Sequence, residues 1–275
     1  NAFKDIFWLE YLHRLWGRMM VVCFAVPFTI FVMIGWINFY LGVRLLGILI
    51  LTSMQGVLGW YMVQSGLVDH PDVSQYRLAA HLGLALVIIA ALFWIARGVN
   101  PYFIAKCHDD NKDSVIGLRR GAILLVVIIF ITSCSGALVA GLNAGLTYNT
   151  FPLMDGQWIP EGLFAVIPWY MNFFENVITV QFDHRILAMT SGISVVLFWL
   201  ASRRYRLSRL TSLAIKIMFA VVIFQIGLGV STLLMTVPVS LAIGHQGFGV
   251  VLFICSVWVV RELTPYSKNM INGEL

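Results

Sequence analysis

Seven long apolar stretches limit the folds that are open to this chain. A helix needs about 20 mainly apolar residues to cross a bilayer, and every one of these stretches is that long. Only 11% of the 275 residues are charged, whereas a soluble domain carries about 25%. The sequence therefore predicts an all-α integral membrane protein and argues against a soluble enzyme or a nucleic-acid-binding protein. The stretches lie near residues 15–38, 42–64, 78–97, 119–141, 182–202, 210–236 and 240–261.

Lysine and arginine gather in alternate connections between the stretches, which predicts how the helices are oriented. Five of them fall within residues 97–120 and four within residues 203–209, whereas residues 142–184 contain none. Positively charged connections stay on the cytoplasmic or matrix side of a membrane. We therefore expect the C-terminus inside and the long connection over residues 142–180 outside.

The two halves of the chain share landmarks at matching spacings, which indicates a duplication. The second copy holds four apolar stretches and the first only three, so we expect an eighth helix and an outer loop upstream of residue 1. Four helices per copy give parallel repeats, that is, two four-helix transmembrane bundles of which seven helices are present here. The corresponding segments are residues 10–14 and 181–185, residues 55–59 and 225–229, and residues 81–97 and 245–261.

The repeat also predicts where the two bundles begin and end. The N-terminal bundle, without its first helix, takes residues 1–100, and the C-terminal bundle takes residues 119–262. An inner connection over residues 101–118 joins them, and an inner tail over residues 263–275 follows.

Four histidines occupy repeated positions, namely His13, His81, His184 and His245. Each lies at the outer end of an apolar stretch, so the two in each half share one depth in the membrane. Ionisable side chains at that depth are costly and usually functional, although a packed or capping histidine is the structural alternative. Zinc usually takes three or four ligands, whereas haem iron takes two axial ligands on opposite faces. We therefore expect each bundle to hold one haem between its two histidines.

One carboxylate distinguishes the two halves. Glu10 lies about one turn before His13 on the same helix face, and Gln181 stands at the corresponding position before His184. A carboxylate near a metal in a low-dielectric site relays protons or stabilises developing charge. We therefore assign chemistry to the N-terminal half and electron storage to the C-terminal half. An interfacial ion pair of Glu10 with a neighbouring basic residue is the alternative.

Two further features lie on the predicted outer side. Arg14, Arg77 and Arg185 are candidates to bind haem propionates through charge-assisted hydrogen bonds, with plain anchoring at the lipid interface as the alternative. The connection from residue 141 to residue 160 is rich in glycine and aromatic residues, so it either covers a cofactor or lies at the interface.

Several motifs together resemble those of the haem A synthases, most closely the branch found in proteobacteria and mitochondria. They lie at residues 10–18, 59–67, 74–81, 141–160 and 181–185, and the resemblance extends from residue 8 to residue 262. It implies eight helices in two bundles. It also implies oxidation of the C8 methyl group of haem O to a formyl group, by two successive hydroxylations through haem I, which supplies haem A to terminal oxidases.

The resemblance further implies roles for individual residues. It assigns His184 and His245 to a resident haem b, His13 and His81 to the substrate haem O, and Glu10 to the essential acidic position. It implies a bacterial plasma (inner) membrane or a mitochondrial inner membrane, with the haem sites towards the periplasmic or intermembrane side. Haem O synthase, an electron donor and a second copy of the chain are candidate partners. Part of the family carries cysteine pairs in the outer loops, which residues 142–180 lack.

Two other functions fit parts of the pattern. A di-haem electron carrier of the membrane would use the same four histidines but would give Glu10 no chemical role. A small-molecule transporter would fit the parallel repeats but would leave the histidines unexplained.

Overall fold

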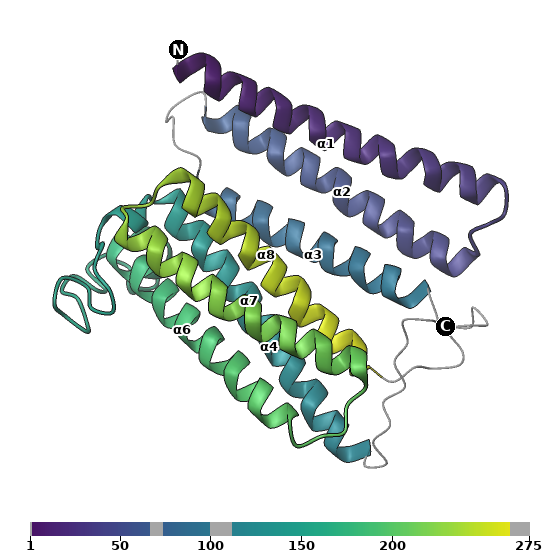
Figure 1. The fold of residues 1–275 in the computed structure, drawn as a ribbon. Coiled ribbons are helices and arrows are strands. Elements are labelled where there is room, and N and C mark those ends of the chain that lie inside the picture. Colours follow the sequence, from purple (N-terminus) through teal and green to yellow (C-terminus); the bar gives the residue numbers. More distant parts are fainter. Residues whose placement is uncertain (1, 67–73, 100–111, 265–275) are drawn as a thin grey trace. The chain divides into compact units, whose positions relative to one another are not determined.

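The structure, a computed structural model, describes residues 2–66, 74–99 and 112–264. Seven helices in these ranges are long and apolar enough to span a membrane, which confirms the prediction of an all-α membrane protein. Figure 1 shows them in their order along the chain. Their bounds are α1 Ala2–Met33, α2 Phe39–Gly66, α3 Gln75–Val99, α4 Lys112–Gly141, α6 Val177–Ser202, α7 Arg209–Leu234 and α8 Val239–Glu262.

These helices carry apolar side chains on their exposed surfaces. Leu124 on α4 is 58% exposed and Ile193 on α6 is 60% exposed. Contiguous apolar surface of this kind is a liability in water, whereas lipid tails cover it in a membrane. A helix in a bilayer satisfies its own backbone hydrogen bonds, which is why long apolar stretches fold this way there.

Residues up to Tyr61, which include α1 and most of α2, belong to one unit of the chain. The connection over residues 34–38 reverses the chain, and Gly35 in it adopts the left-handed conformation with φ at 74°. The side chain of Asn38 accepts a hydrogen bond from the Leu41 N–H (2.9 Å) and so caps the start of α2.

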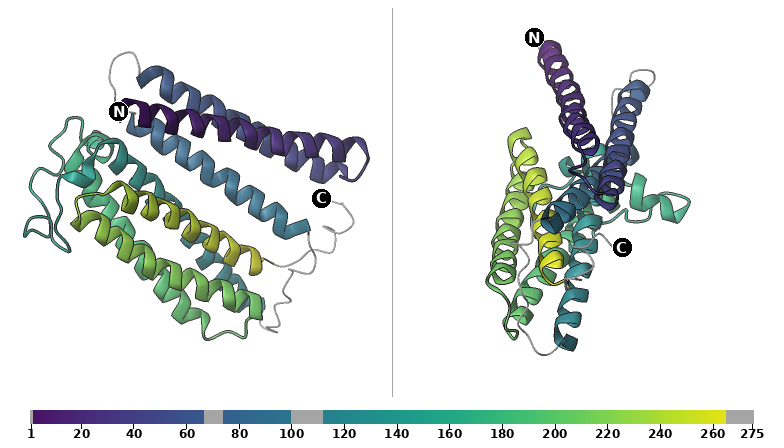
Figure 2. Two further views of the ribbon diagram at one scale, coloured as in Figure 1. Left: turned by 45° about the horizontal axis from the view of Figure 1, so that its top comes forward. Right: turned by 90° about the vertical axis from the view of Figure 1, so that its right-hand side faces the viewer.

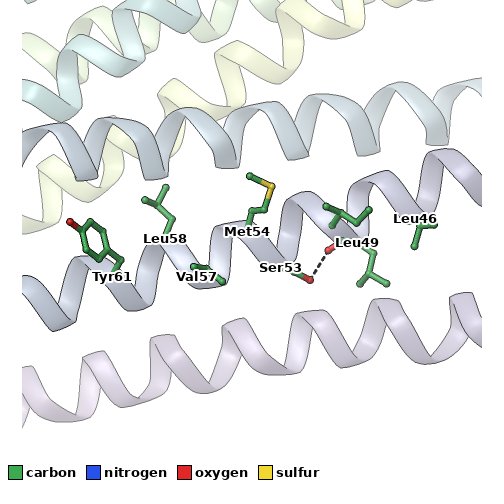
Figure 3. A pocket seen from close by; sticks show the side chains of 8 residues that line it. Leu46, Leu49, Ser53, Met54, Val57, Leu58 and Tyr61 are labelled. Carbon is green, nitrogen blue, oxygen red and sulfur yellow. Dashed lines mark hydrogen bonds between the residues drawn. The ribbon is translucent and has the colours of Figure 1, made fainter.

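One face of α2 forms an apolar hollow of about 580 Å³, seen from close by in Figure 3. The Ser53 hydroxyl in it donates back to the Leu49 carbonyl (2.8 Å), so its hydrogen is already used within the helix. The hollow therefore offers an apolar surface rather than a polar binding site. It is lined by Leu46, Leu49, Ile50, Ser53, Met54, Val57, Leu58 and Tyr61.

Residues 62–265 form the second unit. Within it α4, α6, α7 and α8 form a closed ring in which each helix packs against the next, and α3 packs against α4 and α8. Figures 1 and 2 show these five helices running alongside one another. Their shared core includes fully buried side chains from four helices, namely Leu86, Val195, Ala214, Met218 and Val259.

The predicted boundaries of the two bundles stay a prediction. The sequence assigned α3 to the N-terminal bundle, and in the structure α3 contacts two helices of the C-terminal half. Most of the predicted connection over residues 101–118 and of the tail over residues 263–275 lies outside the described residues.

Residues 142–176, which connect α4 to α6, fold into a loop with internal order. Asn172 is buried at its centre, where its side-chain oxygen accepts from the Val166 N–H (2.9 Å). Its amide group donates to the carbonyls of Val166 (2.7 Å) and Trp169 (2.8 Å). The side chain of Asn176 donates to Asn172 and caps the first turn of α6. The loop contains η2 (Ala144–Leu146), η3 (Trp169–Met171) and α5 (Asn172–Glu175).

The loop lies at the end of the second unit where α3, α6 and α8 begin, which we call the loop end (Figure 1). At this end the Tyr76 hydroxyl of α3 donates to Oε1 of Glu175 (2.5 Å). The α3 backbone also passes close to α4, since a Cβ on Gly141 would lie 2.5 Å from the Cα of Gln75. Glycine at residue 141 therefore permits this approach of the two helices.

We expect Asn172→Ala to destabilise the protein. The change leaves three polar backbone groups in the loop without their partner, at about 1–3 kcal/mol for each that stays buried. Thermal unfolding in detergent micelles measures the effect, and Glu161→Gln at an exposed position of the same loop is the control. Equal melting temperatures for the two variants would contradict the structural role of Asn172.

Candidate functional site

His184 is the eighth residue of α6, and its ring is seated against α4. A Cβ on Gly136 of α4 would lie only 3.1 Å from the ring atom Cε1 of His184. The absence of a side chain at this glycine therefore provides the space for the imidazole. The neighbouring Ser135 holds the ring, since its Oγ lies 2.8 Å from Nδ1 of His184.

The hydrogen bonds around this ring favour one of its two neutral tautomers. The Ser135 hydroxyl donates its one hydrogen to the Thr132 carbonyl (2.7 Å), so it accepts in its contact with His184. This arrangement favours a proton on Nδ1 of His184, with the lone pair on Nε2. A neutral imidazole whose Nδ1–H is held by a protein group is the form that binds a metal through Nε2.

His245 is the seventh residue of α8, and its ring likewise packs against a glycine of a neighbouring helix, here α7. A Cβ on Gly229 would lie 2.8 Å from Cε1 of His245, so any larger residue there would displace the ring. Gln225, one turn earlier on α7, donates from its side-chain amide to the His245 carbonyl (3.0 Å). Gly249 on α8 leaves room for that amide, because a Cβ there would lie 3.3 Å from Nε2 of Gln225.

The two seated histidines belong to helices on opposite sides of one ring. In the order α4, α6, α7 and α8, the helices α6 and α8 are not neighbours but stand across from each other. His184 and His245 both lie within the first eight residues of their helices, and both helices begin at the loop end. Two imidazoles offered from opposite sides suit a haem with two axial ligands. Within the described residues no group of three or more His, Cys, Asp or Glu side chains is arranged to hold a metal ion.

Two side chains of α6 attach the loop beside His184. Gln181 through Nε2 (2.9 Å) and Arg185 through Nη2 (2.8 Å) both donate to the Tyr148 carbonyl. Arg185 also donates through Nη1 to the Thr150 carbonyl (2.9 Å). An uncharged amide is needed at residue 181, because a carboxylate would have no hydrogen to give to a carbonyl. The Glu10 to Gln181 difference between the halves thus has a local structural reason.

The remaining predicted site residues lie on α3 and α1. His81 is the seventh residue of α3 and is half-buried, and Arg77 precedes it by one turn. His13 and Arg14 are exposed on α1, which belongs to the other unit. The side chain of Glu10 lies outside the part of the chain that the structure describes. The pairing of His13 with His81 therefore stays a prediction.

Sequence reasoning missed the side chains that seat the two rings. Nothing in the sequence distinguishes Ser135 or Gly136 from other small residues in an apolar helix. Gly229 did carry a signal, because it ends the repeated segment 225–229 and corresponds to Gly59.

Known proteins similar to this chain come from bacteria and from mammals. Residues 1–257 match the model of the cytochrome oxidase assembly protein family, COX15-CtaA. The chain is 49% identical over 264 residues to the Heme A synthase of Nitrosospira multiformis, which covers 96% of this chain and 73% of that protein. It is 44% identical over 276 residues to Heme A synthase COX15 of Homo sapiens, which covers 98% of this chain and 66% of that protein. These similarities confirm the resemblance inferred from the motifs.

We expect Gln181→Glu to loosen the loop. The new carboxylate would face the Tyr148 carbonyl with no hydrogen to share, and losing this bond costs about 1–3 kcal/mol. Limited proteolysis should then cleave residues 142–176 faster than in the unchanged protein. Gln157→Glu is the matched control, since the side chain of Gln157 is exposed and already accepts through its oxygen. Equal cleavage rates in both variants would refute the attachment.

Proposed function

Because the chain belongs to the cytochrome oxidase assembly family, which includes the haem A synthases, we propose that it acts through two haem sites, one in each half. The reaction is the oxidation of haem O to haem A, carried out by an integral membrane oxidoreductase. We assign a resident haem b to His184 and His245, and the substrate haem O to His13 and His81. The observation that carries the haem b assignment is the pair of imidazoles packed against glycines on opposite sides of one ring of helices.

The described residues of the C-terminal half fit a haem. Nε2 of His184 keeps its lone pair because Nδ1 is committed to Ser135. Nε of Arg185, one residue after His184, is buried and has no hydrogen-bond partner among the described residues, so its N–H can donate to a propionate. When bound, haem b would supply one-electron storage for the oxidation. The loop that Gln181 and Arg185 hold keeps water from the haem edge in this proposal.

In the N-terminal half the proposal is supported by the repeat. His13 and His81 correspond to the two seated histidines and hold the substrate, while Arg14 and Arg77 bind its propionates. Glu10 exchanges protons while the C8 methyl group is oxidised, which the amide of Gln181 at the corresponding position has no means to do. The half with the carboxylate therefore performs the chemistry, and the half with the amide stores electrons.

The charge distribution supports an orientation for these sites. Residues 142–184 contain no lysine or arginine, so we propose that the loop end faces the periplasm or the intermembrane space and that the C-terminus is inside. Haem O would then arrive from haem O synthase within the membrane, and an electron donor would reduce the protein. A second copy of the chain is a further candidate partner.

Identifying the haems that the protein contains tests the proposal. The full-length gene is expressed in a host that makes haem O, and the haems extracted from the purified protein are identified by mass. Haem I or haem A alongside haem b would support the assigned sites. Haem b alone, at two per chain, would instead favour a di-haem electron carrier, and a haem-free protein would refute the ligand assignments.

We expect Glu10→Gln to stop product formation while the protein keeps haem b. The change puts into the N-terminal half the amide that the C-terminal half already has, and removing a general acid or base lowers rates by about 100- to 10,000-fold. The ratio of haem A to haem b, measured by mass, reports the effect. Glu161→Gln, the same change at an exposed position of the loop, should leave the ratio unaltered. Normal haem A formation in Glu10→Gln would remove the proposed role.

We expect Gly229→Ala to weaken the haem b site. The added methyl group would lie 2.8 Å from Cε1 of His245 and force its ring away from its preferred rotamer. Such a distortion costs about 0.5–1.5 kcal/mol, which corresponds to a roughly 2- to 10-fold faster loss of haem. Transfer of haem to a scavenging haem-binding protein measures this rate. Gly227→Ala is the matched control, because open space surrounds that glycine on the same helix. Identical rates of haem loss in the two variants would argue against the role of Gly229 in placing the His245 ring.

A further inference from the structure

At the end of the second unit opposite the loop, α3 and α8 each place an arginine against a tryptophan of the other helix. The guanidinium of Arg97 on α3 lies over the ring of Trp258 on α8, 5.7 Å from its centre. The guanidinium of Arg261 on α8 lies over the ring of Trp94 on α3, 5.1 Å from its centre. Both distances are within the range of cation–π attraction. Each helix therefore gives one cation and one aromatic ring to the other.

These side chains stand at corresponding positions of the internal repeat. On each helix the tryptophan follows the histidine by 13 residues and the arginine follows it by 16, counted from His81 on α3 and from His245 on α8. Two contacts that are equivalent in this way, each from one helix to the other, are what a local two-fold axis between two helices produces. The contact between the two copies of the repeat is therefore symmetric in its cations and rings.

One carboxylate breaks this symmetry. Glu262 on α8 forms an ion pair with Arg97, and its Oε1 also accepts from Nε1 of Trp258 (2.9 Å). The corresponding position on α3 is Gly98, where a Cβ would lie 3.2 Å from Nη2 of Arg261. The glycine thus leaves room for the second arginine to approach, and only α8 contributes an acid at these corresponding positions.

The group is shielded from solvent, since Arg261 is 7% exposed and Glu262 is 6% exposed. A buried ion pair adds little net stability, because desolvation offsets the attraction between the charges. Separating its partners is nevertheless costly, because each would remain as a buried charge without a counter-ion. Such a contact therefore restricts geometry more than it adds stability. We call the five side chains the clasp, namely Trp94, Arg97, Trp258, Arg261 and Glu262.

We propose that the clasp sets the crossing of α3 and α8 and thereby the separation between His81 and His245. The inference rests on the proposed function, in which these histidines bind two different haems. Sixteen residues of helix, about 24 Å, separate each arginine of the clasp from the histidine on its own helix. A change of roughly 5° in the crossing would displace a histidine by roughly 2 Å at that distance. The clasp residues are positioning residues and touch neither haem.

Pulsed electron spin resonance on the full-length protein measures this separation directly. Spin labels are attached at Ala80→Cys and Ile243→Cys, two exposed positions beside the histidines, in a background without the native cysteines that still binds haem. We expect the distance distribution between the labels to broaden and shift in Glu262→Gln and in Arg97→Met. Arg97→Lys, which keeps the cation over the ring, should largely restore the distribution of the unchanged protein.

A matched control separates this effect from a general loss of arginine–tryptophan contacts. Arg203 lies over the ring of Trp199 at 5.3 Å, but Trp199 is in the last turn of α6 and Arg203 directly follows that helix, so their contact does not join two helices. Arg203→Met should therefore leave the distance distribution unchanged. Unchanged distributions in both Glu262→Gln and Arg97→Met would overturn the proposal, as would an equal broadening in Arg203→Met.

The haem content of the same samples distinguishes failure of the proposal from failure of the proposed function. The distance between the labels can be measured whether or not haem is bound. A haem-free unchanged protein would therefore refute the haem sites and leave the clasp to be judged by distance alone. If the clasp proposal and the proposed function both hold, the Glu262→Gln variant should keep haem b, show a shifted distance between the labels and form less haem A. Where Arg97→Met fails to fold, Glu262→Gln, which keeps the size of the side chain, decides the outcome.

Discussion

Enclosing two imidazole rings among apolar helices imposes much of the local structure of the C-terminal half. A buried polar atom without a partner costs about 1–3 kcal/mol, so a ring nitrogen there needs a hydrogen bond or a ligand. Ser135 meets this need at Nδ1 of His184, and Gly136 and Gly229 make the space that the two rings occupy. Small residues on α4 and α7 thus accommodate the histidines on α6 and α8, and Ser135 contacts Nδ1 of His184 rather than Nε2.

The loop and the clasp tie the helices together at opposite ends of the second unit. At the loop end, Gln181 and Arg185 attach the loop to α6, and the hydrogen bond from Tyr76 to Glu175 attaches it to α3. At the other end the clasp joins α3 to α8. Between them lies an apolar core, whose contacts are not directional and so tolerate small changes in helix crossing. Polar contacts at both ends supply the directional restraint.

At both ends, single residues differ between corresponding positions of the predicted repeat. Glu10 corresponds to Gln181, whose amide holds the loop where a carboxylate would not. Gly98 corresponds to Glu262, and the missing side chain of the glycine admits an arginine from the other copy. In each of these two pairs, one position carries an acid. The other carries a residue that donates a hydrogen bond, as Gln181 does, or one that leaves space, as Gly98 does. The physical demand of the neighbouring segment decides which residue each copy carries.

The seven membrane-spanning helices of the described residues follow from the sequence by itself, and so do the four repeated histidines, because span length and charge at membrane depth are properties of a single stretch. The predicted limits are close for most of these helices, but α1 and α4 begin well before the predicted stretches. The predicted pairing of His184 with His245 also came from the repeat. The tertiary structure alone decided that Gly136 and Gly229 seat the rings, that Arg185 holds the loop and that α3 joins α8 through the clasp. Helices that are apolar on every side carry no stripe that identifies their neighbours, so these contacts depend on how the packed helices fit together.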